Sequence, residues 1–382
     1  MKTPSTAATT DPDPQAQPSG KADGSKSVPC PVCKGPVRPG LGRGRWIYCN
    51  ERCAKEAMRI RAPLDQFLFR ARRHADALIG RLRSSRRRAT LTDEAIAQAT
   101  ASVNDLAVRV ADEGPLPAIR RTIARLHPLI TDALAADAVS EEVFVRSLTI
   151  LCECGGTDLA VLARIARSIT AMWARLSSIP HVVRSLIREA FVYRLADEPD
   201  HAFKRFSRAT HLVEWFMEPD AQETLLLRHH ILHLTHRICL DNGHASQQHV
   251  DEMVAIAATL DLPHVRRDTW LESAGHYVVA RRLQRAEECL AAVGTWPLRL
   301  EPAVFEHFPR FHRAGVARVH LQLALARGLP RDRRFLLDLY RQQATDYENF
   351  RFASVARIWD GRPVTSQTIF IPLFGDYGRQ LG

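Results

Sequence analysis

From residue 93 almost to its end, the chain has the pattern of successive α-helices. Apolar residues recur at helical spacing in segments of about 15 to 20 residues. The segments are separated by short breaks rich in proline, glycine and aspartate, near Gly114-Pro115, Gly155-Gly156, Glu198-Pro199, Glu218-Pro219, Asn242-Gly243, Leu262-Pro263, Gly294 and Gly328. No apolar alternation long enough for a sheet appears before residue 360. Short breaks of this kind join antiparallel helices, so we expect a mostly α fold for residues 91–358.

Two windows of this helical region share one spacing. The first has Leu186, Ala190, Tyr193, Ala202, Phe206 and Ala209, and the second has Trp270, Ala274, Tyr277, Ala286, Leu290 and Val293, 84 residues further on. A large, a small and an aromatic residue in one helix, followed by alanine and two packing positions in the next, is similar to the tetratricopeptide family. The resemblance covers these two windows only, and 84 is not a multiple of that family's repeat of about 34 residues. It implies a tetratricopeptide-like α-solenoid; the alternative is an irregular helical bundle.

The two ends of the chain differ from this region. Residues 1–27 are rich in Pro, Ser, Thr, Ala and Gly and have almost no large apolar side chain, so we expect a disordered tail. Residues 359–382 include the β-prone, apolar run 364–374, which we expect to dock on the last helices.

Four cysteines near the N-terminus form two closely spaced pairs, Cys30-x2-Cys33 and Cys49-x3-Cys53. Zn²⁺ takes four such thiolates in a tetrahedron, and this arrangement is close to known zinc signatures. The first pair, with Pro31 inside it and Gly35 after it, is typical of a knuckle, and the second of the first turn of a helix. The alternatives are two unrelated pairs or a disulfide. We therefore predict a zinc finger over residues 28–61, with Zn²⁺ held by all four cysteines.

This stretch resembles the treble-clef fingers of bacterial DNA-associated proteins, among them small zinc-ribbon inhibitors of DNA gyrase. The matching residues are Cys30, Pro31, Cys33, Arg45, Tyr48, Cys49, Arg52 and Cys53. The chain departs from the gyrase inhibitors at Asn50 and in Ala54-Lys55-Glu56-Ala57, where those proteins have different residues. The resemblance implies zinc ligation and a treble-clef fold, and not inhibition of gyrase.

The positive charge of the chain is concentrated beside this finger. The formal net charge is +11, while residues 28–90 alone carry 16 Lys and Arg against four Asp and Glu, a net charge of +12. A basic patch confined to one module is typical of a polyanion partner. Residues 62–90 read as a basic helix or linker, with a helix over 64–88 that ends in an arginine run. We expect nucleic acid, most of all DNA, to contact Arg43, Arg45, Arg52, Arg59, Arg86, Arg87 and Arg88; the alternative is a solvated helix face.

Catalytic motifs are weak by comparison. His229, His230, His233 and His236 fall on one expected helix, and His229 and His233 are close enough in sequence to share a metal. No glutamate follows His229 at the metalloprotease spacing, so a buried or groove-lining histidine face is favoured. Cys152-Glu153-Cys154 lacks a second redox signal. The chain has no Walker phosphate loop, dinucleotide glycine fingerprint or Gly-x-Ser-x-Gly elbow.

Together these features predict a non-enzymatic regulatory protein. We expect its zinc-binding module to contact DNA and its helical repeats to bind a protein or peptide. The alternative is an interaction adaptor with a structural finger and no nucleic-acid binding. Without a secretory signal or an apolar run of about 18 residues, we expect a cytoplasmic protein with no membrane association.

Overall fold

A computed structural model describes residues 50–84, 92–113, 117–154, 159–195, 198–241 and 246–294, together with Cys30, Val32 and a few positions between 316 and 328. The chain divides into two units, residues 1–58 and 59–382, which are considered separately. The expected treble-clef hairpin, the tail 1–27 and the run 364–374 lie outside the described residues.

The described residues are almost entirely helical and contain no strand, so the predicted mostly α fold is confirmed. Within them, none of the helices is long and apolar enough to span a lipid bilayer. The helices are α1 (Glu51–Ser84), α2 (Asp93–Glu113), α3 (Pro117–Ala135), α4 (Glu141–Cys154), α5 (Leu159–Arg175), α6 (Ile179–Leu195), α7 (Pro199–Phe216), α8 (Gln222–Asp241), α9 (Gln247–Leu260), α10 (Pro263–Val279) and α11 (Leu283–Ala292).

The helix starts follow from local capping chemistry. The hydroxyl oxygens of Thr92 and Ser140 accept the backbone N–H of Ala95 and Val143, each at 3.3 Å, just before α2 and α4. Ser246 accepts the N–H of His249 before α9. Pro199 and Pro263 occupy the first positions of α7 and α10, where the missing N–H of proline costs nothing. The expected breaks at Glu198-Pro199 and Leu262-Pro263 are therefore confirmed.

Helix α1 is longer than the sequence suggested. We expected a short helix bearing the second cysteine pair and a separate helix over 64–88, but one helix of 34 residues runs from Glu51 to Ser84. Pro63 lies inside it on the exposed side. Proline removes one intrahelical hydrogen bond, and the carbonyl left without a donor can be hydrated on an exposed face.

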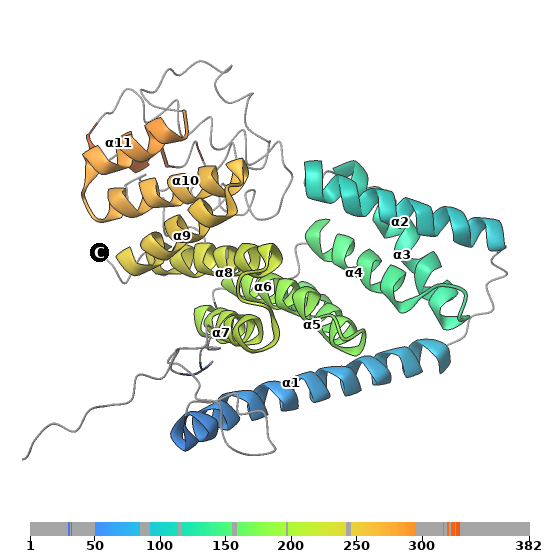
Figure 1. Ribbon diagram of the computed structural model, residues 1–382. Helices are drawn as coiled ribbons and strands as arrows, with labels where there is room; N and C mark the ends of the chain where they lie inside the picture. Colours follow the sequence, from blue (N-terminus) through green and yellow to red (C-terminus); the bar gives the residue numbers. More distant parts are fainter. Residues whose placement is uncertain are drawn as a thin grey trace, which may run out of the picture. The chain divides into compact units, whose positions relative to one another are not determined.

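In the second unit, helices pack against their neighbours in the chain. α6 contacts α5 and α7, α4 contacts α3 and α5, and α10 contacts α9 and α11 (Figure 1). The two windows of shared spacing fall on the hairpins α6–α7 and α10–α11. Their small residues Ala190, Ala202, Ala274 and Ala286 are fully buried, which allows the paired helices to approach closely. Sequential packing of helices is therefore shown by the structure.

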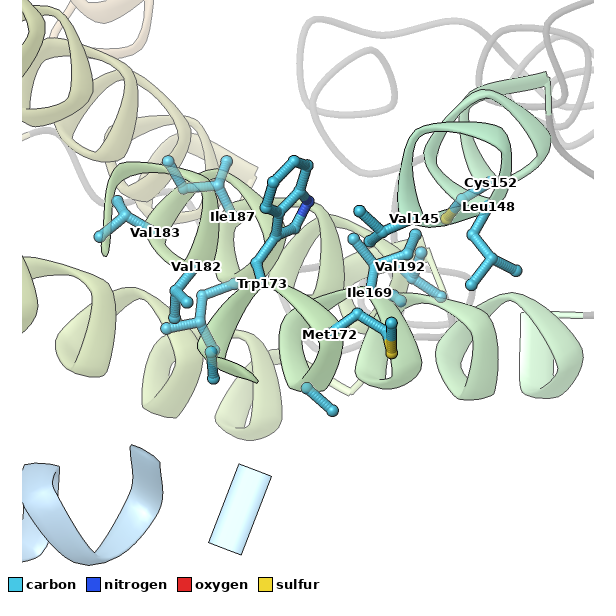
Figure 2. Close-up of a cluster of buried hydrophobic side chains, with 14 of the residues drawn as sticks. Val145, Leu148, Cys152, Ile169, Met172, Trp173, Val182, Val183, Ile187 and Val192 are labelled. Atoms are coloured by element: carbon cyan, nitrogen blue, oxygen red, sulfur yellow. The ribbon is translucent and has the colours of Figure 1, made fainter. Parts of the chain in front are cut away.

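A continuous hydrophobic core joins helices α1 through α8. Figure 2 shows part of it, where Val145, Leu148 and Cys152 of α4 lie near Ile169, Met172 and Trp173 of α5 and Val182, Val183, Ile187 and Val192 of α6. Leu64, Leu68, Ala75 and Ile79 of α1 belong to the same core. The apolar face of α1 is thus used for packing on the body.

Candidate nucleic-acid interface

The cysteine end of α1 begins with a cap. The Asn50 side-chain oxygen accepts the backbone N–H of Cys53 at 2.8 Å, and the Asn50 carbonyl accepts the N–H of Ala54. This is the N-cap arrangement, so Cys53 lies in the first turn of α1. Cys30 and Cys53 are both buried within the first unit, as zinc ligands would be. Cys33 and Cys49 lie outside the described residues.

The described part of the chain holds no group of three metal-ligating side chains placed to share an ion. Because two of the four expected zinc ligands are not among those residues, this finding does not bear on the predicted zinc finger. The four thiolates suit Zn²⁺ by their chemistry, and they would leave no open coordination position for a substrate.

Among the arginines expected to contact nucleic acid, Arg52 and Arg59 are solvent-exposed on α1. Arg43 and Arg45, and the run Arg86, Arg87 and Arg88, lie outside the described residues. Arg70, Arg73 and Arg81 are also exposed on α1 and make no ion pair with any described residue. They belong to the basic helix predicted over 64–88, although they are not among the seven arginines expected to contact DNA.

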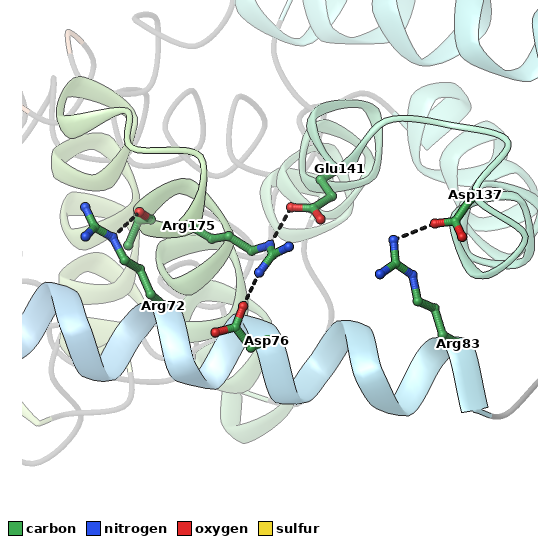
Figure 3. Close-up of polar contacts among 7 residues, drawn as sticks. Arg72, Asp76, Arg83, Asp137, Glu141 and Arg175 are labelled. Carbon is green, nitrogen blue, oxygen red and sulfur yellow. Dashed lines mark hydrogen bonds and ion pairs between the residues drawn. The ribbon is translucent and has the colours of Figure 1, made fainter.

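Other arginines of α1 dock it onto the body of the second unit. The Arg72 Nε donates a hydrogen bond to the Ala174 carbonyl in the last turn of α5, at 3.0 Å. Arg83 pairs with Asp137, in the turn after α3, at 2.5 Å (Figure 3). The Arg61 guanidinium lies over the Phe216 ring at the end of α7, 5.6 Å from its centroid. These three arginines therefore have partners within the protein.

Arg175 of α5 completes this attachment from the other side. Its guanidinium pairs with Asp76 of α1 and donates to Glu141 at the start of α4 at 2.8 Å (Figure 3). A single side chain therefore links α1, α4 and α5. In addition, the Arg208 guanidinium of α7 lies over the Phe67 ring of α1, 4.3 Å from the centroid. These contacts, together with the buried leucines, fix which face of α1 points outward.

Three of the four histidines of α8, His229, His233 and His236, are buried or half-buried, as the favoured interpretation predicted, whereas His230 is exposed. His229 is buried, and its Nε2 lies 2.7 Å from the Thr269 hydroxyl of α10. His233 lies 3.7 Å from buried Glu272, which also accepts a hydrogen bond from Arg237. The rings of His229 and His233 are 6.3 Å apart, edge to face. With these partners, the pair belongs to a polar interface between α8 and α10.

A cluster of three histidines was not anticipated from the sequence. His236 of α8 is fully buried, and its ring lies 5.8 Å from that of His249 in α9 and 5.3 Å from that of His276 in α10. Burial, then His276, His249 and Arg237, lowers the pKa of His236 to about 3. His276 Nε2 faces the Gln247 side-chain oxygen at 3.2 Å. The imidazoles are therefore neutral at pH 7, and the cluster carries no charge there.

The Cys152 and Cys154 pair does not have the character of a redox centre. Both are buried in α4, and burial, reinforced by Glu153, raises the pKa of Cys154 to about 12. A thiol with so high a pKa is protonated at pH 7, whereas a reactive cysteine must ionise. This agrees with the weak signal that Cys-x-Cys gave in the sequence.

Comparisons with known proteins give no relative for this chain. No protein-family model, no curated protein and no solved structure matches it. Its function must therefore be argued from its own residues.

Proposed function

We propose that this chain is a non-enzymatic, zinc-binding regulatory protein that contacts DNA through its basic N-terminal module and a protein or peptide through its helical body. The proposal rests on one observation: α1 lies in a region of net charge +12 and exposes several of its arginines. Its apolar face is buried in the second unit, while Arg59, Arg70, Arg73 and Arg81 are exposed. A rigid helix that presents exposed arginines is suited to contact the regularly spaced phosphates of a nucleic acid.

The zinc module is proposed as a treble-clef finger closed by Cys30, Cys33, Cys49 and Cys53. The N-cap at Asn50 supports it, because it places Cys53 in the first turn of a helix, where a treble clef carries its second ligand pair. Zn²⁺ would have a structural role here. We assign base contacts to Arg43 and Arg45, backbone contacts to Arg86, Arg87 and Arg88, and a further nucleic-acid contact to Arg52.

The body is proposed as a tetratricopeptide-like solenoid that binds a protein or peptide. The support is the shared spacing in α6–α7 and α10–α11, with its buried alanines and with Tyr193 and Tyr277 half-buried at the aromatic position. Arg205 of α7 also pairs with buried Glu189 of α6 at 2.8 Å, and its guanidinium lies over the Tyr193 ring. Such hairpins stack into curved arrays whose concave side recognises extended partners.

A second candidate function is an interaction adaptor without nucleic-acid binding. The docking of Arg61, Arg72 and Arg83 on the body favours it, because part of the basic charge then has a structural use.

A titration of DNA with the full-length protein separates the two functions. We expect a fluorescent 20-base-pair duplex to bind with an affinity that falls with salt, with a log–log slope of about −0.9 per phosphate contacted. Replacing Arg86, Arg87 and Arg88 by Ala should weaken binding to every sequence and flatten the slope. Replacing Arg43 and Arg45 should change sequence preference more than the slope. If neither duplex nor single-stranded DNA binds at low salt, the adaptor function is the one that remains.

A further inference from the structure

The arginines of α1 in the second unit form two rows with the same repeat. Arg61, Arg72 and Arg83 are spaced 11 residues apart, and so are Arg59, Arg70 and Arg81. Eleven residues make three helical turns and about 20°, so each row stays on one side of the helix, with about 16 Å between neighbours. The two rows are offset by two residues, about 200° around the axis, and thus lie on opposite sides.

The first row, named the docked row, is Arg61, Arg72 and Arg83, and it faces the body. Each member reaches a different part of it: the Phe216 ring, the Ala174 carbonyl and the Asp137 carboxylate. Figure 3 shows Arg72 and Arg83 in these contacts on one side of α1. These guanidinium groups are engaged within the protein.

The second row, named the outer row, is Arg59, Arg70 and Arg81, and all three are exposed. Exposed Arg73 lies on the same side, since it is three residues from Arg70. Both acidic residues of α1 in the second unit, Asp65 and Asp76, fall on the side of the docked row. Asp65 pairs with Arg61 and Asp76 with Arg175. From Arg59 to Arg81 the outer side of α1 therefore carries positive charge, and the nearest carboxylate of the helix on that side is Glu56, three residues before Arg59.

We propose that the outer row, with Arg73, is the surface of α1 that contacts the phosphate backbone of a nucleic-acid duplex, and that the docked row only attaches α1 to the body. This inference rests on the proposed function and assigns its backbone contacts. Guanidinium groups on a rigid helix, held at fixed separations by α1, can contact several phosphates without further ordering. The docked row makes the surface rigid, because it fixes the rotation of α1 about its own axis.

An anionic membrane is a poorer partner for this surface. A basic helix that lies on a bilayer inserts its own apolar face among the lipids. In α1 that face, with Leu64, Leu68, Ala75 and Ile79, is already buried in the protein core. Charge is thus the main attraction that the outer row offers, and a nucleic-acid backbone supplies the highest density of opposite charge.

Two triple variants of the full-length protein test the assignment, because each removes three positive charges from the same helix. In the outer variant Arg59, Arg70 and Arg81 are replaced by Gln, and in the docked variant Arg61, Arg72 and Arg83 are replaced by Gln. Affinity for the duplex is measured by anisotropy over a salt series, and thermal stability by circular dichroism.

We expect the outer variant to lose at least about tenfold in affinity and to show a salt slope smaller by up to about 2.7, while its melting temperature stays that of the wild type. The docked variant should melt at a lower temperature and, below it, bind within about threefold of the wild type. Equal loss of binding in both variants, or none in the outer variant, would overturn the assignment while leaving the proposed function intact. No binding by the wild type would instead remove the proposed function. Binding of the wild type to phosphatidylserine vesicles and not to the duplex would overturn the assignment and make an anionic membrane the partner of this surface.

Discussion

His236 illustrates how a single side chain takes its properties from helices distant in the sequence. It lies fully buried beside His249 and His276, which belong to two other helices. These two imidazoles and Arg237 are the groups whose charge affects His236. Against burial, which lowers the pKa of both neighbouring imidazoles, the negative charge of Glu252 acts to raise the pKa of His249, and that of Asp251 acts to raise the pKa of His276. Burial is the largest cause of the lowered pKa of His236, and the neighbouring positive charges add to it. The neutral imidazole is therefore the form that the fold requires.

The sign of the resulting pH dependence follows from linkage. The pKa of His236 falls from 6.5 to about 3 on folding, so between these values the unfolded chain binds a proton that the folded chain does not. The free energy of unfolding is then largest above pH 6.5 and decreases as the pH falls, by up to about 1.4 kcal/mol per pH unit for each such group. We expect His236→Leu to flatten the dependence of the urea midpoint on pH between 6.5 and 4.

The matched control is His74→Leu, because His74 is exposed on α1. The same slope in the wild type and in His236→Leu would show that His236 is not what makes the protein acid-sensitive.

Among the helices, the paired elements α6–α7 and α10–α11 depend on small residues. Ala202 and Ala286 occupy matching positions of the two windows, and both are fully buried where two helices meet. A larger side chain there must push the helices apart or adopt a strained rotamer. The close approach of each pair therefore depends on small side chains at these positions.

Ala286→Leu should lower the free energy of unfolding by about 1–3 kcal/mol, measured by urea denaturation, because the added atoms overpack the contact between α10 and α11. Ala202→Leu should act in the same way on α6–α7. Ala291→Leu provides the control, since Ala291 is exposed on the same helix as Ala286. Equal stability of the Ala286 and Ala291 variants would contradict close packing at this hairpin.

In the whole molecule, the proposed zinc site and the main hydrophobic core belong to different units. The second unit has its own hydrophobic core, which includes α1 residues from Leu64 onward. The first unit contains all four cysteines of the proposed finger and only a short part of α1. Zinc binding and folding are coupled in small fingers, because the metal supplies their folding free energy. Loss of zinc should therefore affect the first unit and spare the second.

We predict that the purified full-length protein holds one Zn²⁺ and that Cys30→Ser or Cys49→Ser releases it, while the helical circular dichroism signal and the main melting transition persist. Cys289→Ser is the control and should keep the metal. Cys289 is buried in α11, and burial raises the pKa of its thiol to about 11. Metal analysis that finds no zinc in the wild type would eliminate the finger.

The sequence by itself determined the helices and most of their starts. Periodicity and capping are local: Thr92, Ser140 and Pro199 act on residues within one turn, so their effect can be read along the chain. The buried positions of the two windows were predictable for the same reason. The C-terminal ends of the helices were harder to predict. Asp137, Ser177, Asp261 and Arg281 have a positive φ after helices, where glycine is the usual signal.

Only the tertiary structure decided which arginines of α1 face outward. Both rows have the same composition and the same 11-residue spacing, so the arginines themselves do not show which row docks on the body. Arg72 faces the body because its side chain donates a hydrogen bond to a carbonyl 102 residues away. Asp76 faces the body because it pairs with Arg175. In the same way, His236 gained its neighbours by packing between helices. Such contacts depend on how helices distant in sequence are brought together, and that is settled by burial of the whole core.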